Sequence, residues 1–398
     1  MKKNKVILVS LNELNFDKIE KYLSSKNFSS IKEIKKNLST TSSEFDYKKL
    51  EPWIQWVSIY FGLKAEEHKV SRLGEEMKFN FENIFQTLEK KGCKIGAISP
   101  MNIFNNFKNP SYFIPDPWTK TKSDNNYWSK LLHNSVSVLV KDNARKKINF
   151  KSYFCFLLAF IKYARISNYY LFIKMFIKGF KNKWFKALFL DLFLHDFHLK
   201  KLKENSAEFS NIFFNSLAHI QHHYFFNSFD SLELRNPKWY IDSNKDPLLD
   251  GLEVFEKILS DYLKLSKEYK IIISTGLTQV PYDMVKYYYR LKNHKEFFIS
   301  LGINIDEVQE LMSRDFIIKF NYESSAKEAL EVIRKLKTSD NEKLFSDITL
   351  KNCEIFLTLS VNKEINAQGV FYNDRLIIKN LKQFVDFVAI KNGMHDGK

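Results

Sequence analysis

Apolar runs of strand length alternate with amphipathic segments over much of the chain. The run "VILVSL" at 6–11 is continuously apolar, and the residues that follow it ("NELNFDKIEKYLSS") take on helical spacing. The stretch at 80–99 repeats the pattern, with an amphipathic segment, a stop at Gly92 and a second apolar run at 94–98. Continuous apolar runs are typical of strands that are buried on both faces. The first hundred residues therefore predict a strand, helix, strand order.

The same order returns later in the chain. A strand is predicted near 210–217, and an amphipathic helix that begins near 251 leads into a strand at 270–274. Strands that alternate with helices favour a parallel sheet with helices on both faces. The fold class is therefore expected to be α/β, with a largely parallel central sheet. Further on, 285–350 is predicted to be largely helical and 351–381 to form paired strands.

The segment 125–205 departs from this pattern. It is rich in aromatic residues and lysine, and no apolar run in it reaches the roughly 20 residues that a membrane span needs. Two interpretations stay open: a helical cap that packs on itself and on the sheet, or helices of 150–203 that lie in a membrane interface with lysines reaching anionic headgroups. The expected organisation is an α/β core of 1–124 and 206–398 with a helical insertion at 125–205.

Charge and cysteine content narrow the class of protein. The chain has 62 Lys and Arg against 46 Asp and Glu, a net charge of +16, which indicates a phosphate-rich partner. The basic residues are scattered and mixed with apolar ones, so nucleic-acid binding is not expected. Three distant cysteines, Cys93, Cys155 and Cys353, support neither a disulfide framework nor a thiolate metal site, which favours a reducing cytoplasm.

Polar residues follow each predicted strand of the central sheet. Ligands of open parallel sheets bind beyond the carboxyl ends of the strands, so these side chains predict a site. They are Asn12, Glu13, Ser99, Asn215, His219 and Thr275. For Asn12 and Glu13 the alternative is that they cap the helix that follows.

Three histidines lie within five positions of "NSLAHIQHHYFF" (215–226). They either bind a metal or phosphate group, or pack and hydrogen-bond locally. On a helix, His222 (i+3) or His223 (i+4) shares the face of His219, so one of the two is expected to act with it.

Five motifs in order resemble the alkaline phosphatase-like superfamily. They are the first strand with "NELN", "EPWIQWVSIYFGLKAEEHKV" (51–70), "NSLAH" (215–219), "IIISTGLTQ" (271–279) and "NGMHDGK" (392–398). The chain is most similar to the phosphodiesterase and nucleotide-pyrophosphatase branch and to relatives found among bacterial surface-polysaccharide genes. The resemblance implies a site with two metal ions, usually zinc, and a Thr or Ser nucleophile at the carboxyl ends of the sheet.

The resemblance implies one set of metal ligands in this chain. The superfamily's Asp-x-x-x-His matches Asn215 and His219, its late His matches His395, and its first-strand Asp falls on Asn12 beside Glu13. The second metal's ligand pair falls on "TGL" (275–277), which has no good zinc ligand. One divalent ion, zinc or manganese, is therefore expected rather than two.

The superfamily's nucleophile falls at or near Pro52, which has no reactive group, and Ser58 is the nearest hydroxyl. The catalytic candidates are Ser58, Gln55 and His223. The candidate substrate contacts are Trp56, His222, Thr275 and Arg314, against the alternatives that Trp56 packs in the core and that Arg314 forms a surface ion pair. His395 binds nothing if the last residues fray.

The expected function is a metal-dependent hydrolase or group transferase that acts on a phosphate or sulfate ester of a glycan or a lipid-linked surface-polysaccharide precursor. The expected location is cytoplasmic, peripheral on the inner membrane. The alternative is a catalytically degenerate alkaline phosphatase-like protein that binds an anionic glycan or lipid. Loss of the second metal's ligands and of the nucleophile favours the alternative.

Overall fold

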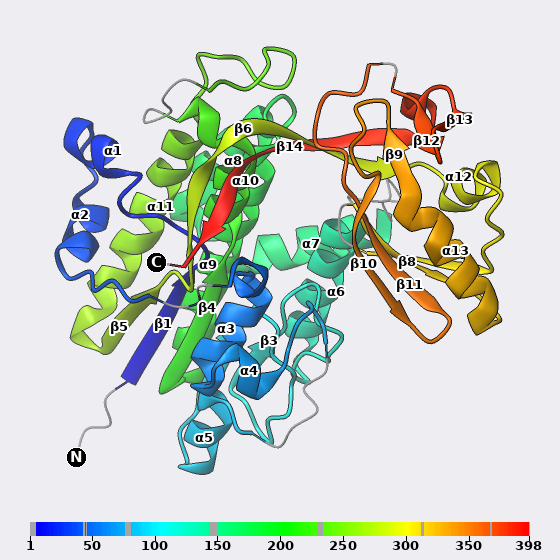
Figure 1. Cartoon of the computed structure of the whole chain (residues 1–398). Coiled ribbons are helices and arrows are strands. Elements are labelled where there is room, and N and C mark those ends of the chain that lie inside the picture. The colour runs from blue at the N-terminus through cyan, green and yellow to red at the C-terminus, as the bar shows by residue number, and fades with distance from the viewer. Residues whose placement is uncertain are drawn as a thin grey trace. The chain divides into compact units, whose positions relative to one another are not determined.

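A five-stranded parallel sheet forms the centre of the protein in the computed structural model (Figure 1). Its strand order is β3-β2-β4-β1-β5, and every neighbouring pair is parallel. The strands are β1 (Lys5–Leu11), β2 (Ile95–Ile98), β3 (Tyr112–Ile114), β4 (Phe209–Phe214) and β5 (Tyr269–Ser274). The structure describes residues 5–397 apart from 43, 45, 76–80, 143–149, 229–233, 312–313 and 367.

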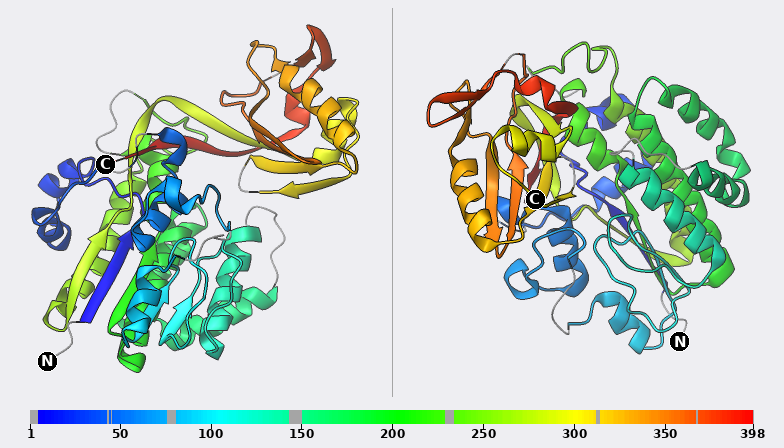
Figure 2. Two further views of the ribbon diagram at one scale, coloured as in Figure 1. Left: turned by 60° about the horizontal axis from the view of Figure 1, so that its bottom comes forward. Right: turned by 90° about the vertical axis from the view of Figure 1, so that its right-hand side faces the viewer.

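Helices cover both faces of this sheet, which confirms the α/β prediction (Figures 1 and 2). Successive residues of a strand point to opposite faces. On β4, Phe213 packs edge-on against Trp56 of α3, whereas Phe214 packs against Phe255 and Tyr262 of α11. The helices around the sheet are α1 (Glu20–Ser25), α2 (Ser29–Lys36), α3 (Pro52–Phe61), α4 (Ala65–His68), α5 (Ile84–Lys90), α6 (Tyr127–Asp142), α7 (Phe150–Tyr163), α8 (Tyr169–Gly179), α9 (Trp184–Asn205), α10 (Ser216–Tyr224) and α11 (Pro247–Lys264).

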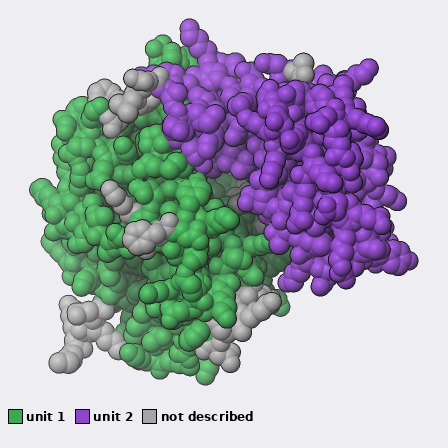
Figure 3. Space-filling view, viewed as in Figure 1, with its two compact units in different colours: residues 1–233, 241–281, 393–398 green, residues 234–240, 282–392 purple. Residues whose placement is uncertain are grey.

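The chain divides into two compact units, which Figure 3 shows in different colours. The first comprises 1–233, 241–281 and 393–398, and the second comprises 234–240 and 282–392. The segment 125–205 forms helices α6 to α9 within the first unit, and its description as an insertion stays a prediction. The second unit was not predicted as a separate body. The chain enters it within β6 (Thr278–Leu291) and leaves it within β14 (Val385–Asp396), two strands that pair with each other.

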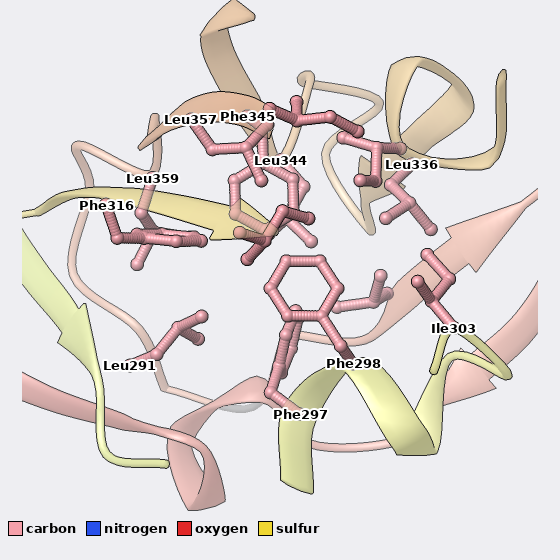
Figure 4. Close-up of a cluster of buried hydrophobic side chains, with 14 of the residues drawn as sticks. Leu291, Phe297, Phe298, Ile303, Phe316, Leu336, Leu344, Phe345, Leu357 and Leu359 are labelled. Carbon is pink, nitrogen blue, oxygen red and sulfur yellow. The ribbon is translucent and has the colours of Figure 1, made fainter. Parts of the chain in front are cut away.

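The second unit has antiparallel sheets and its own aromatic core (Figure 4). Phe297, Phe298 and Phe345 lie at its centre, each 1% exposed or less. Its sheets have the orders β10-β11-β8-β7 and β13-β12-β9. Its elements are α12 (His294–Ser300), β7 (Glu307–Glu310), β8 (Asp315–Lys319), α13 (Glu323–Lys335), β9 (Leu336–Thr338), β10 (Phe345–Lys351), β11 (Glu354–Leu359), β12 (Val370–Tyr372) and β13 (Arg375–Ile378).

Two sequence predictions of local structure are corrected. The segment 285–350 is not largely helical, because strands such as β8, with alternating burial, separate its two helices. The strand predicted near 210–217 ends at Phe214, and residues from Ser216 onward begin α10. Paired strands within 351–381 are confirmed, with β12 antiparallel to β13.

A buried ionic network joins α9 and α11 to the turn before α8. Arg165 contacts Asp196 of α9 at 2.6 Å and Asp261 of α11 at 2.6 Å, and Asp196 is fully buried. Burial acts to raise the pKa of Asp261, but hydrogen bonds from His195, Lys257 and Arg165 outweigh it and hold the pKa below its ordinary value. The network therefore depends on an ionised Asp261.

We expect Arg165→Met to lower the free energy of unfolding by about 3–5 kcal/mol, because it leaves buried carboxylates without their partner. Arg334→Met is the matched control. Arg334 is half exposed and pairs with Glu331 on the surface, and such an ion pair contributes about 1 kcal/mol or less to stability. Urea denaturation measures both. The pKa of Asp261 is lower in the folded than in the unfolded state, so its contribution to stability is complete above about pH 4 and is lost as the pH falls further. Acid is therefore expected to reduce the difference in unfolding free energy between Arg165→Met and the wild type. Equal losses in the two variants at neutral pH would contradict this account.

Candidate metal centre

Three neighbouring strands end at the same edge of the central sheet. Leu11 of β1 is in register with Phe214 of β4, and Ser10 of β1 with Ser274 of β5. The backbone amide of Asn12 donates to the Phe214 carbonyl at 3.0 Å, and that of Glu13 donates to the Thr275 carbonyl at 2.9 Å. The parallel register therefore brings the residues after all three strands to one place, as the sequence predicted.

Glu13 is the centre of this edge. Its side chain is 2% exposed, and its backbone has a φ of 60°. That left-handed conformation costs a non-glycine residue about 1 kcal/mol or more, and it turns the carboxylate back toward the sheet edge. Asn12 Nδ2 donates to Glu13 Oε1 at 2.7 Å, and Gln279 Nε2 donates to Glu13 Oε2. Two amides thus fix the carboxylate from both sides.

Two histidines face the same carboxylate oxygen. His222 Nε2 lies 3.0 Å and His395 Nε2 lies 3.2 Å from Glu13 Oε2, and the two nitrogens are 3.3 Å apart. The histidine side chains are 16% and 12% exposed, so the cluster is reached from their side. Burial acts to raise the pKa of Glu13, but attraction to the two histidines and their hydrogen bonds outweigh it and hold the pKa well below 4.5.

The two histidines come from α10 and from the end of β14, and close packing of the backbone brings these elements together. At Gly393 an added Cβ would lie 2.1 Å from Gln279 Oε1 and 2.8 Å from the Gln221 carbonyl oxygen. Glycine is therefore required at Gly393 for β14 to pass beside α10. The Gly393 carbonyl lies 3.1 Å from His222 Nδ1, on the side of the ring away from Glu13.

The start of α10 is held by the neighbouring helix α9. Asp191 of α9 accepts hydrogen bonds from the backbone amides of Asn215, at 3.1 Å, and Ser216, at 2.8 Å. These amides have no partner within α10, and an acidic group at a helix N-terminus is favourable. Burial raises the pKa of Asp191 to about 6, against these hydrogen bonds, which lower it. The contact fixes the helix that carries His222.

Glu13, His222 and His395 match the ligand set of a divalent transition metal. Among the described residues, these three form a group of possible ligands in which one atom of each side chain lies within 4.8 Å of the other two. Zinc binds two histidines and one carboxylate at about 2.0–2.2 Å, which separates tetrahedral ligand atoms by about 3.3 Å. The three separations of 3.0, 3.2 and 3.3 Å are close to this value.

The tautomer of His222 also fits a metal. A carbonyl oxygen only accepts, so the Gly393 carbonyl requires a proton on His222 Nδ1. A neutral His222 then presents the lone pair of Nε2 to the Glu13 carboxylate, and two acceptors 3.0 Å apart repel each other. Either a second proton or a metal ion between the two groups relieves this repulsion. Glu51 Oε2 lies 3.5 Å from His395 Nδ1, the position of the carboxylate that commonly orients a metal-bound histidine.

Asn12 supports Glu13 instead of binding metal, a correction to the sequence prediction. The indole Nε1 of Trp56 is only a donor, and it lies 2.7 Å from Asn12 Oδ1, which fixes the orientation of the amide. Asn12 therefore presents its nitrogen to the site, where it donates to Glu13 and, at 2.8 Å, to Asn215 Oδ1. An amide NH₂ does not coordinate a cation. Asn215 lies beside the cluster, with its oxygen bonded to Asn12. Asn12 and Glu13 do not cap the following helix, since the N-cap of α1 is Ile19.

His222, expected as a substrate contact, takes the place in the cluster that the resemblance implied for His219. His219 and His223 are on the same helix, with ring centroids 4.7 Å apart, and neither belongs to the group with Glu13. Helix α10 turns about 100° per residue, so its neighbours decide which of the three histidines meets Glu13. The catalytic role predicted for His223 stays a prediction.

Ser58 is bonded in a way that does not activate it. Its Oγ lies 2.9 Å from His68 Nε2, while His68 Nδ1 accepts from the Val70 amide at 3.1 Å. Burial lowers the pKa of His68, so the ring is neutral at pH 7 and carries its proton on Nε2. His68 therefore donates to Ser58 and does not accept its proton. The catalytic role predicted for Ser58 is therefore corrected: Ser58 accepts a hydrogen bond from His68, which also binds the backbone at Val70.

The tryptophan and glutamine of α3 are structural. Trp56 is 0% exposed and packs against Tyr60 and Phe213, so it offers no stacking face to a ligand. Gln55 is buried, and its Nε2 donates to the Lys49 carbonyl at 2.9 Å. The core alternative given for Trp56 is confirmed, and the substrate contact predicted for Trp56 and the catalytic role predicted for Gln55 are corrected.

Thr275 and Arg314 lie in different units. Thr275 contributes its carbonyl to the Glu13 amide at the sheet edge. Arg314 belongs to the second unit, where its guanidinium lies 4.1 Å from the centroid of the Tyr288 ring. The predicted substrate contacts of Thr275 and Arg314 stay predictions.

Three residues of the site were not predicted: Glu51, Gln221 and Gln279. Gln221 Nε2 donates to the Glu13 carbonyl at 2.8 Å, and Gln279 binds the Glu13 carboxylate. Glu51 immediately precedes Pro52, the position where the resemblance places the nucleophile. Glu51 and Gln279 lie within recognised motifs and Gln221 lies two residues after one, but no spacing rule identifies a residue that supports a ligand.

Comparisons with known proteins add a weak likeness in structure. No protein-family model matches the chain, and no curated protein matches it. The solved structures similar to it include two of phosphonoacetate hydrolase from Sinorhizobium meliloti 1021, in complex with phosphonoformate and with phosphonoacetate. Each is 10% identical and covers 99% of this chain and 90% of its own, with TM-scores of 0.42 and 0.41. A likeness this low assigns neither a family nor an activity.

We expect Gly393→Ala to displace β14 from α10, because the new Cβ would overlap the Gln221 carbonyl. The loss in unfolding free energy is expected to be about 1–3 kcal/mol, with weaker binding of added zinc. Gly179→Ala in α8 is the control: its Cβ would find its nearest neighbour at 3.5 Å, and alanine is favoured in helices. Thermal unfolding and zinc titration test both, and unchanged zinc affinity in Gly393→Ala would contradict this packing.

Proposed function

We propose that this protein is a metal-dependent hydrolase or group transferase with one divalent ion, zinc or manganese, held by Glu13, His222 and His395. The observation that supports it most is the mutual separation of three ligand atoms at 3.0–3.3 Å beside a correctly oriented His222. A bound divalent ion polarises a phosphoryl oxygen and lowers the pKa of a bound water. The chain's own residues then determine position and access.

The supporting residues keep the ligands ready for binding. Asn12 and Gln279 hold the two oxygens of Glu13 in place, and the two histidines keep the pKa of this buried carboxylate low. The Gly393 carbonyl orients His222, and Glu51 lies behind His395. Such outer partners typically contribute 10–100-fold to metal affinity. The partly exposed histidines leave one side of the cluster accessible to a substrate.

We propose direct attack by water or by a substrate hydroxyl. The position that the resemblance assigns to the nucleophile falls at Pro52, the first residue of α3, and Ser58 is bonded to His68. Neither residue supplies an activated oxygen. A reaction without a covalent enzyme intermediate fits these two residues.

The proposed substrate is a phosphate or sulfate ester of a glycan or of a lipid-linked surface-polysaccharide precursor. The order of the five motifs and the net charge of +16 support an anionic substrate. The proposed location is cytoplasmic, on the inner membrane.

A binding protein without catalysis is the second candidate. The bonding of Ser58 and the proline at position 52 favour it, because the residues expected to react do not. In this case the cluster, with or without a metal, would bind an anionic glycan or lipid. Metal content and turnover separate the two candidates.

We expect the purified protein to contain close to one zinc or manganese per chain, and His222→Ala to abolish this content, because it removes one of three ligands. His219→Ala is the matched control on the same helix and is expected to retain the metal. Elemental analysis measures the metal occupancy. Added zinc should raise the unfolding temperature of the wild type and of His219→Ala, but not that of His222→Ala. A native protein without metal that also fails to bind added zinc or manganese would exclude the proposed mechanism.

We expect the metal-loaded protein to hydrolyse p-nitrophenyl phosphate, bis(p-nitrophenyl) phosphate or p-nitrophenyl sulfate, with Glu13→Gln lowering the rate at least 100-fold, because the neutral amide weakens the ligand set. Ser58→Ala is expected to retain most of the activity. Stoichiometric metal without turnover of any of the three esters would favour the binding protein. Loss of activity in Ser58→Ala would return Ser58 to the reaction.

A further inference from the structure

Helix α8 and the segment before it carry large apolar side chains on their outer surface. Six of these side chains are at least 62% exposed, and we call them the α7–α8 apolar face: Ile161, Ile166, Tyr170, Phe176, Ile177 and Phe180. Single exposed apolar residues are common on proteins, but a contiguous group marks an interaction site. These six lie within twenty residues of sequence, and Tyr170, Phe176 and Ile177 share helix α8.

The spacing on α8 shows that this exposure follows the helix and is not scattered. Its buried positions, Phe172, Met175 and Gly179, follow one stripe, which packs toward α9. At 100° per residue, Tyr170, Phe176 and the other exposed residues follow a second stripe about 120° wide. An ordinary surface helix has polar residues on that side. Helix α8 therefore has two apolar faces, of which one packs within the protein.

Basic residues lie along one edge of this second stripe and after its C-terminal end. The stretch 150–190 contains eight Lys and Arg and no Asp or Glu. Lys181, Lys183 and Lys186 follow α8 and are exposed. On the helical projection, Lys174 and Lys178 lie along one edge of the stripe. An apolar stripe bordered by lysines is the composition of helices that lie in the interface of anionic bilayers.

Other partners fit this surface less well. In a symmetric dimer the same patch meets itself, so the lysines beside the stripe would face their own copies. A nucleic acid would bind the lysines but leave the apolar stripe in water. A bilayer with anionic headgroups satisfies both parts, since lysines reach the headgroups while apolar side chains enter the acyl boundary.

We propose that the α7–α8 apolar face docks the protein on an anionic lipid surface, with α8 lying in the plane of the interface. None of the helices of the described part of the chain is long and apolar enough to cross a membrane. This surface belongs to the first unit, as does the metal centre, but the inference does not depend on the proposed reaction.

Cosedimentation of the full chain with vesicles tests this proposal. We expect binding to vesicles of equal parts phosphatidylcholine and phosphatidylglycerol, weaker binding in high salt, and little binding to phosphatidylcholine alone. Ile177→Glu is expected to lower the vesicle partition coefficient about tenfold or more, since it places a charge where an apolar side chain would enter the bilayer. Ile299→Glu is the matched control: Ile177 is 63% and Ile299 62% exposed, and both changes remove one unit of positive net charge.

A second pair of variants tests the charges. Lys181→Ala with Lys183→Ala is expected to lower partitioning about tenfold, and Lys335→Ala with Lys337→Ala to leave it nearly unchanged. Circular dichroism checks that each variant is folded. Absence of vesicle binding, or equal losses in variant and control, would overturn the proposal. The proposal would also be overturned if the wild type formed a dimer, did not bind vesicles, and dissociated into monomers in the Ile177→Glu variant. A second copy of the chain would then cover the face.

Discussion

The site depends on one buried carboxylate that must stay ionised. Glu13 is nearly inaccessible to solvent, and burial of a charge is unfavourable unless partners compensate it. Here Asn12 and Gln279 donate to its oxygens, while His222 and His395 supply positive charge or share a cation with it. These partners come from widely separated parts of the sequence. The sheet register, the path of β14 and the position of α10 all serve this one group.

The sequence predicted the central sheet because burial on both faces leaves a continuous apolar run, as in β1 and β2. It did not predict β3, whose three residues are too short to show a pattern. It also missed the separate second unit. Strands such as β8 and β10 alternate in burial, which gives a weaker sequence pattern than the amphipathic helix α13 that lies between them in the sequence. The helical pattern of α13 was therefore extended over both strands.

The site was predicted in outline. Glu13 and His395 were named from strand ends and motif order, and parallel strands do bring the former to the sheet edge. The choice of His222 over His219 was not predictable, because a helix presents several faces and only the packing of Gly393 against α10 selects one. Likewise, the tautomer that prevents His68 from activating Ser58 depends on a backbone amide, which no residue pattern reveals.

The order of the ligands along the chain has a consequence for biosynthesis. Glu13 leaves the ribosome before the two histidines of the cluster, and His395 follows only after the whole second unit. At ordinary elongation rates this delay is on the order of tens of seconds. During that time the nascent first unit holds an acidic group whose final counter-charge has not been synthesised. The C-terminal end of β14 therefore completes the cluster of Glu13, His222 and His395 and relieves the unpaired charge in the same step.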